Sequence, residues 1–458
     1  MSSKTRDIII LLLSIITVIS VINIIFNYLN HGKASLTIIS IAPNLNISFA
    51  TEPLGLLFML MVSVLWLITH IYSIGYMNFH YQKIDLSKFY TLILFSIFCS
   101  FGVALASNLL TLFVFYEFLT ICTYFLIVFD PDENKMKAGR IYLTYLFGSS
   151  LAFFLPAIIL TYSYTGSITF TYGGVFSETS QYIGIMFLLY LFGIAKTAII
   201  PLHSWLPSAM VAPIPVSALL HAVAVVKTGI FCILKIVIYI FSVSRLNEYA
   251  QNSNLSLIIQ IVAGTTIIIA SILALAQNSI KKLLAYSTIS QLSYSILAIS
   301  IFTKKAVIAA VFHMISHAIS KITLFFAAGN IYTATGKTDI SEISGIAKII
   351  PVTMIAFLIG ALSMIGIPPA SGFLSKFYIF TASWGMKNNY IIIIVLLLTS
   401  LISTSYFSKL LYNAYFEKTK EDISINKLSF YMQFSIILTS LAIILLNIFA
   451  QHIISFIS

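Results

Sequence analysis

Long apolar runs follow one another along this chain and strongly restrict its fold. The runs from Asp7 to Asn30 and from Tyr390 to Tyr415 each reach the ~20 residues that a helix needs to cross a bilayer. Only 9% of the residues are charged, whereas a soluble domain carries about 25%. We therefore predict an all-α, polytopic membrane protein rather than a soluble globule.

The apolar pattern predicts 13 transmembrane helices and one hairpin outside the membrane. In the segment 34–52, apolar residues alternate with polar ones from Leu45 to Phe49, and this period of two indicates extended strands. The first span is too long for the apolar core of a signal peptide, so we expect it to be retained. The predicted spans are 7–28, 53–76, 88–106, 108–129, 139–163, 182–207, 213–241, 255–277, 285–303, 306–332, 350–386, 389–414 and 431–455.

The distribution of loop lysines and arginines predicts the orientation. With the N-terminus in the cytoplasm, 14 of them lie inside and five outside, in agreement with the positive-inside rule. Counting 350–386 as two short spans would weaken this asymmetry. We therefore predict a multi-pass protein of the cytoplasmic (inner) membrane, with the N-terminus in the cytoplasm and the C-terminus outside. The five outside residues are Lys33, Arg245, Lys304, Lys305 and Lys387.

Two predicted spans are interrupted, one in each half of the chain. Span 182–207 contains Pro201, and span 350–386 contains Pro368 and Pro369 between two glycines. Paired broken helices in corresponding halves indicate a transporter built from inverted repeats. An unwound helix also leaves backbone groups that need water or protein partners at membrane depth.

We expect the chain to consist of four parts. We expect the two inverted repeats to contain five helices each and to translocate protons. The parts are 1–87 (N-terminal helices and hairpin), 88–241 (first repeat), 255–414 (second repeat) and 415–458 (cytoplasmic loop and C-terminal helix).

Six lysines lie in the apolar helical stretches. A charge at mid-bilayer costs about 2.5–3.5 kcal/mol on insertion scales, so membrane segments rarely keep one without a use. Removal from water also disfavours the charged ammonium, which prepares it to release a proton. Four of the lysines are central, and two lie nearer helix ends, where a long side chain can reach the interface. The central ones are Lys196, Lys227, Lys321 and Lys376; the others are Lys235 and Lys409.

Glu117 is the one carboxylate that this pattern places near the membrane centre. A carboxylate there stays ionised only if a cation lies close, and Lys196 is the natural partner. A purely structural ion pair gives little net stability after desolvation. We therefore predict that Glu117 and Lys196 form a functional pair that tunes protonation, with a structural ion pair as the alternative.

His313, His317 and Lys321 are spaced i, i+4 and i+8, so they share one helix face with modest drift. Imidazole both donates and accepts, which suits a proton relay; hydrogen-bonded core residues are the alternative. Nearby Cys, Asp or Glu residues that would complete a metal site are missing. Two histidines on one helix face also cannot hold a haem from both sides. We therefore expect no metal and no cofactor in this chain.

Lys227 is central in its span, and we expect it on the main path. His221 lies six residues earlier and points to another face, so the sequence leaves open whether it relays protons or packs. The role of His203, near a helix end, is equally open. The three cysteines lie in apolar stretches without the spacing of a metal site or disulfide. They are Cys99, Cys122 and Cys232.

Five segments carry a resemblance to a known family. These segments, in the order in which they occur along the chain, resemble the antiporter-like membrane subunits of the proton-conducting transporter family, over roughly residues 50–415. That family includes pump subunits of respiratory complex I and membrane subunits of Mrp-type cation/proton antiporters and of membrane-bound hydrogenases. The segments are LLTLFVFYEFLT (109–120), AKTAIIPLHSWLPSAMVAPIPVSALLHA (195–222), KKLLAYSTISQLSY (281–294), FHMISHAISKITLFFAAG (312–329) and IGIPPASGFLSKFYI (365–379).

The resemblance implies a role for each candidate residue. Glu117 resembles the carboxylate that modulates the lysine of the first broken helix, and Lys196 resembles that lysine. Lys227 and the face of His313 and His317 resemble the central hydrophilic axis. Lys376 resembles the terminal lysine on the second broken helix, where some complex I subunits carry glutamate instead. Relative to the usual pattern, we expect one helix fewer at the N-terminus and no long lateral helix after the last span.

The residues and the resemblance together predict a proton-translocating membrane subunit, with exchange for Na+ or K+ left open. Its partners would be the lipid bilayer and other membrane subunits of an NADH–quinone oxidoreductase-like or Mrp-type complex. Neither a CxxC set nor a GxGxxG motif occurs, so any redox chemistry would belong to partner subunits. The basic residues form no cluster among aromatic residues, so nucleic acid is not expected. The rival interpretations are a membrane redox enzyme that binds quinone or haem itself, and a non-conducting assembly subunit.

Overall fold

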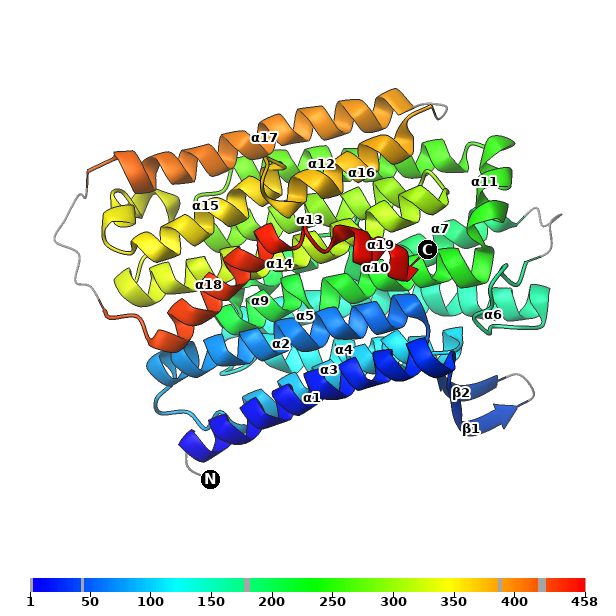
Figure 1. Cartoon of the computed structure of the whole chain (residues 1–458), viewed down its shortest axis with the longest axis horizontal. Coiled ribbons are helices and arrows are strands. Elements are labelled where there is room, and N and C mark those ends of the chain that lie inside the picture. The colour runs from blue at the N-terminus through cyan, green and yellow to red at the C-terminus, as the bar shows by residue number, and fades with distance from the viewer. Residues whose placement is uncertain (1–2, 43–44, 177–181, 386–388, 419–425, 458) are drawn as a thin grey trace.

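The computed structural model describes residues 3–42, 45–176, 182–385, 389–418 and 426–457. Over these ranges the chain is a bundle of long helices that run side by side (Figure 1). Nine helices in the described ranges are long and apolar enough to cross a membrane, or ten if a bent pair near the C-terminus counts as one span. The predicted all-α membrane fold is therefore confirmed, whereas the predicted count of 13 spans is not.

The first half of the bundle begins with α1 (Ser3–His31) and an antiparallel hairpin of β1 (Ser35–Ala42) and β2 (Leu45–Ala50). The alternation of apolar and polar residues predicted this hairpin. A π-helical turn at Ser150–Phe154 joins α5 to α6, so the two continue as one rod. The helices are α2 (Pro53–His80), α3 (Ser87–Leu105), α4 (Leu109–Ile127), α5 (Glu133–Ser149) and α6 (Leu155–Thr165).

The first predicted break lies where expected. α7 (Ile183–Gly193) ends before Lys196, which lies on a 3-10 turn, Ala195–Thr197. A non-helical stretch with Pro201 follows, and a short helix, α8 (Trp205–Ser208), closes the segment. The Lys196 backbone therefore lies at a helix interruption.

A second interruption was not predicted. The span expected at 213–241 is divided into α9 (Ile214–Ala222) and α10 (Val225–Ile236), and a π-helical turn, Val237–Phe241, extends α10. Val223 and Ala224 leave the helix, although neither is glycine or proline. Ile214–Phe241 is nevertheless one candidate membrane span, in agreement with the predicted span, and only its interruption was not predicted.

The second half also consists of long helices, with the predicted break between two of them. α14 occupies its centre and packs against α9, α13, α15, α16 and α18. α15 and α16 are separated by the predicted Pro368–Pro369 break. The axes of α18 and α19 meet at a bend of 74°. The helices are α11 (Val243–Gln251), α12 (Leu255–Leu275), α13 (Ile280–Ile299), α14 (Lys304–Thr335), α15 (Pro351–Ile365), α16 (Ser371–Ser383), α17 (Asn389–Phe416), α18 (Phe430–Leu445) and α19 (Ala450–Ile457).

The bundle has two distinct ends. Figure 1 shows α1 beginning and α17 ending at one end, here called the amino-terminal end. The hairpin β1–β2 projects from the opposite end, here called the hairpin end. Lys387, Lys420 and Ser458, on which part of the predicted orientation rests, lie outside the described residues.

Two glycines allow backbones to touch at the interrupted helices. A Cβ on Gly229 of α10 would lie 2.7 Å from the carbonyl carbon of Lys196 and from the nitrogen of Thr197. A Cβ on Gly372 of α16 would overlap the backbone carbonyl of Ser363 in α15. Any larger residue would push the interrupted segments apart.

Candidate functional site

The structure buries most of the lysines that the sequence singles out. Lys196, Lys227, Lys235 and Lys321 have no exposed surface, and Lys376 is 9% exposed. In contrast, Lys409 on α17 is exposed, as expected for a lysine near a helix end. A buried ammonium must find local partners, and these partners define the candidate site.

Lys196 is held almost entirely by one turn of α4. Its Nζ donates to the carbonyl of Tyr116 at 2.9 Å and to Oγ1 of Thr120 at 2.6 Å. The same Nζ lies 3.1 Å from the centroid of the Tyr116 ring. Two neutral acceptors and a π-face stabilise the cation here without a formal negative charge in contact.

Glu117 lies on the same turn of α4, beside these groups. The residue as a whole is half-buried, its two carboxylate oxygens are buried, and the carboxylate lies within electrostatic range of Lys196. Both residues belong to the described part of the chain, yet no ion pair joins them, and the two carboxylate oxygens have no hydrogen-bond partner there. The functional pairing of Glu117 with Lys196 therefore stays a prediction.

Lys227 meets the histidine face of α14 at the bundle centre. Its Nζ is in hydrogen-bond contact with Nδ1 of His317. The rings of His313 and His317 are nearly parallel, with centroids 6.1 Å apart. His313 continues the polar chain, because its Nδ1 lies 3.1 Å from Oγ of Ser375, and its Nε2 lies 3.0 Å from the carbonyl of Gln291.

Lys376 lies beside this chain, at the second broken helix. It follows Ser375 directly, and its Nζ donates to the carbonyls of Met364 and Ile365 at 3.2 and 2.8 Å. These carbonyls belong to the free C-terminal end of α15, where a cation is electrostatically favoured. The structure thus brings four sequence-predicted residues close together: Lys227, His317, His313 and, through its neighbour Ser375, Lys376.

Lys321 departs from the shared face. Its Nζ donates to the carbonyl of Leu284 at 2.9 Å and to Oγ of Ser287 at 2.5 Å, both on α13. Eight residues of helix rotate a side chain about 80°, so Lys321 points away from His313. The side chain of His221 is outside the described positions, and His203 is half-buried in the turn before α8.

Sequence reasoning missed Glu52. It precedes Pro53 at the start of α2 and resembles a loop residue in the sequence, but it is 2% exposed. Its Oε2 lies 3.3 Å from Nζ of Lys235. Glu117 is therefore not the sole carboxylate available to the buried lysines, and Lys235 does not reach an interface. The one feature of the sequence that could have indicated a partner at this place was the position of Lys235 near a helix end.

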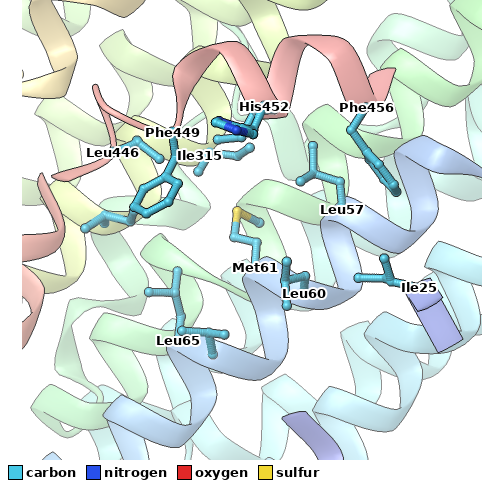
Figure 2. A pocket seen from close by; sticks show the side chains of 13 residues that line it. Ile25, Leu57, Leu60, Met61, Leu65, Ile315, Leu446, Phe449, His452 and Phe456 are labelled. Carbon is cyan, nitrogen blue, oxygen red and sulfur yellow. The ribbon is translucent and has the colours of Figure 1, made fainter. Parts of the chain in front are cut away.

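An apolar cavity of about 410 Å³ lies between α2, α14 and α19 (Figure 2). Ile315 lies about 200° around α14 from His313 and from His317, so the cavity is on the other side of this helix from the histidines. Ile315 and Ile319 of α14 contribute to its wall, together with apolar residues of α1, α2 and α19. His452 is its one titratable wall residue among those described. The cavity is thus separate from the polar chain. Within the described residues, no three His, Cys, Asp or Glu side chains gather as metal ligands.

These features define a class of protein: a membrane protein of many helices, with buried lysines on or beside interrupted helices and a pair of histidines at its centre. The chain belongs to the NADH:quinone oxidoreductase/Mrp antiporter family, whose transmembrane region matches residues 106–403. A second match, to the N-terminus of chain 5 of NADH-ubiquinone oxidoreductase (complex I), covers residues 39–90. The predicted family is therefore confirmed.

Three relatives illustrate the two branches of the family. A putative antiporter subunit mnhA2 of Staphylococcus saprophyticus is 33% identical over 73% of this chain and 43% of its own length. A Na(+)/H(+) antiporter subunit of Alkalihalophilus pseudofirmus is 33% identical over 77% of this chain and 46% of its own. Chloroplastic NAD(P)H-quinone oxidoreductase subunit 5 of Lemna minor is 33% identical over 74% and 46%. The chain spans less than half the length of these relatives.

Two solved structures share the fold over nearly the whole chain. A chain of the Mrp complex from Dietzia sp. DQ12-45-1b matches with a TM-score of 0.85 and 19% identity, covering 99% of this chain and 91% of that one. A chain of the membrane-bound sulfane sulfur reductase, an archaeal respiratory membrane complex, matches with a TM-score of 0.84 and 24% identity, covering 98% and 90%. At these identities the likeness concerns the fold.

Proposed function

We propose that this chain is a proton-translocating subunit of a multi-subunit membrane complex. The contact between Lys227 and His317 carries the proposal. A lysine with no exposed surface has a histidine as its hydrogen-bond partner instead of a carboxylate. Imidazole can take the proton that a desolvated ammonium gives up.

In the first half of the path, Lys196 is the proposed loading site and Glu117 the group that adjusts it. The Tyr116 carbonyl and the Thr120 hydroxyl can accept from the ammonium, and neither holds it by charge. A nearby anionic Glu117 favours the protonated lysine, whereas an approaching positive charge favours its release.

From there, we propose transfer through Lys227, His317 and His313 to Lys376, with Lys321 as a side branch. Moving one charge across the whole membrane requires about 2.3 kcal/mol per 100 mV. This requirement is small compared with the solvation changes of a buried lysine, so modest rearrangements around each group suffice.

The two halves are proposed to be inverted repeats, 88–241 and 255–414, with Lys196 and Lys376 in corresponding places. Both lysines lie beside an interrupted helix, which supports this assignment. We also propose that the amino-terminal end faces the cytoplasm, on the strength of the loop charges. A relative is named as a Na(+)/H(+) antiporter subunit, so Na+ is the first exchange ion to test.

The experiment compares proton and Na+ flux in membrane vesicles that contain the complete complex. Glu117→Gln and Lys196→Ala should each lower flux at least tenfold while the protein accumulates normally. Lys409→Ala is the matched control, because that lysine lies in an apolar helix but is exposed. Its flux should be unchanged.

Near-normal flux in Glu117→Gln or Lys196→Ala at normal abundance would contradict the loading site. Normal flux in these variants and also in Lys227→Ala would instead favour a non-conducting assembly role.

A further inference from the structure

A buried ion pair at the hairpin end is not used by the path described above. Glu52 at the start of α2 is 2% exposed, and Lys235 near the end of α10 has no exposed surface. Lys235 Nζ lies 3.3 Å from Glu52 Oε2. On the other side of the carboxylate, Lys33 Nζ lies 3.4 Å from Oε1, and the Lys33 side chain is 47% exposed. The carboxylate thus connects a fully buried ammonium with one that reaches solvent.

Anchoring the helix does not require this carboxylate. Lys235 Nζ already donates to the carbonyls of Ala104 and Ala106, at 3.1 and 2.6 Å, where α3 ends. Two carbonyls at a helix C-terminus are sufficient to fix a cation. A buried ion pair adds little net stability once both charges are desolvated. The two carbonyls cannot take up a proton from the Lys235 ammonium, whereas the Glu52 carboxylate, 3.3 Å away, can.

Lys235 lies on the same helix as Lys227, which is at the centre of the proposed path. Lys227 and Lys235 are eight residues apart on α10, which is about 12 Å along the axis. Lys227 contacts His317 at the bundle centre. α10 therefore carries one buried ammonium at the histidines and another near the hairpin end.

We propose that Lys235 and Glu52 form a proton outlet from the centre of the bundle to the hairpin end. The inference rests on the proposed function and adds a branch to it. In the step, the N–H bond of the Lys235 ammonium breaks and an O–H bond forms on Glu52, which leaves a neutral amine and a neutral acid. The acid then gives its proton to water beside Lys33, and a proton from the Lys227 side restores the ammonium. The positive Lys33 favours release, because it stabilises the anionic carboxylate.

The test uses the complete complex in vesicles and removes both charges together. In the double variant Glu52→Gln/Lys235→Met, uncharged side chains of similar volume replace the ion pair. Proteins often tolerate such a replacement of a buried ion pair. An outlet predicts normal abundance with flux lowered at least tenfold. A purely structural pair predicts that single variants lose abundance and that the double variant recovers both abundance and flux. Lys409→Met, the same substitution at an exposed lysine, should transport normally.

Two comparisons separate the possible failures. If Lys196→Ala abolishes flux in the same vesicles but the double variant transports normally, the outlet is wrong and the proposed function stands. If Lys196→Ala and Glu117→Gln also transport normally, the proposed function itself has failed.

A measurement on the unsubstituted protein decides the matter even if the double variant does not accumulate. An apolar carbodiimide reacts with protonated carboxyl groups. An outlet passes through protonated Glu52, so the peptide that contains Glu52 should gain the adduct by mass spectrometry as flux is lost. Modification of other carboxylates, with Glu52 unmodified, would overturn the outlet.

Discussion

The substitution Gly229→Ala tests the closest backbone approach in the candidate site. A Cβ at this position would lie 2.7 Å from two backbone atoms of the Lys196 turn and 2.9 Å from the Lys196 Cβ. Backbone atoms cannot rotate away as the end of a side chain can, so either α10 or the turn must shift. Forced overpacking of this kind costs about 1–3 kcal/mol.

A second effect acts in the opposite direction. Alanine is better than glycine inside a helix by roughly 0.5–1 kcal/mol. Gly229→Ala should therefore lower the free energy of unfolding by about 0.5–2 kcal/mol and reduce flux, because the Lys196 turn moves. Gly148→Ala is the matched control: it lies in α5 and has no atom within 4 Å of the added Cβ. It should leave stability unchanged or raise it.

Thermal unfolding in detergent provides the assay. The three cysteines are free and buried, so a dye that fluoresces on reaction with thiols follows their exposure on unfolding. The midpoint of Gly229→Ala should fall below that of the unsubstituted protein, and the midpoint of Gly148→Ala should not. Equal midpoints for the two variants would refute the close packing of α10 on the Lys196 turn.

Two further predictions concern the second half and the orientation. Lys376→Ala should abolish flux, whereas Lys376→Glu should keep part of it, because a carboxylate can also bind and release a proton there; equal loss in both would show that positive charge itself is required. Fusions of paired reporters should be active in the cytoplasm at Lys420 and outside at Asn388 and Ser458, because the loop charges favour this orientation. Cytoplasmic activity at both Asn388 and Ser458 would remove the support for aligning Lys196 with Lys376.

The sequence predicts those parts of the fold that have local causes. Prolines marked the breaks near Lys196 and Lys376, and alternation marked the hairpin. The break at Val223 and Ala224 contains neither proline nor glycine, and both residues are fully buried. Packing against other helices decides the backbone there, and periodicity along one segment contains no information about it.

The candidate site also contains some features that the sequence predicts and others that depend on tertiary packing. Spacing placed His313 and His317 on one face, and the structure shows their rings in parallel. Which helix faces them cannot be derived from that spacing, so the contact of His317 with Lys227 was not predictable. Glu52 was missed because its burial comes from tertiary packing around Lys235, whereas its neighbours in sequence suggest a loop.

The two nitrogens of His313 have unequal surroundings. Nε2 faces the carbonyl of Gln291, which can only accept, so Nε2 carries a hydrogen whether the ring is neutral or charged. A second proton must therefore reside on Nδ1, beside the Ser375 hydroxyl. That hydroxyl has one hydrogen and a second acceptor, the carbonyl of Gly372 at 2.8 Å. When His313 becomes charged, the Ser375 hydroxyl must turn from the ring to the carbonyl of Gly372, so the charge state of the imidazole sets the orientation of one O–H bond near the start of α16.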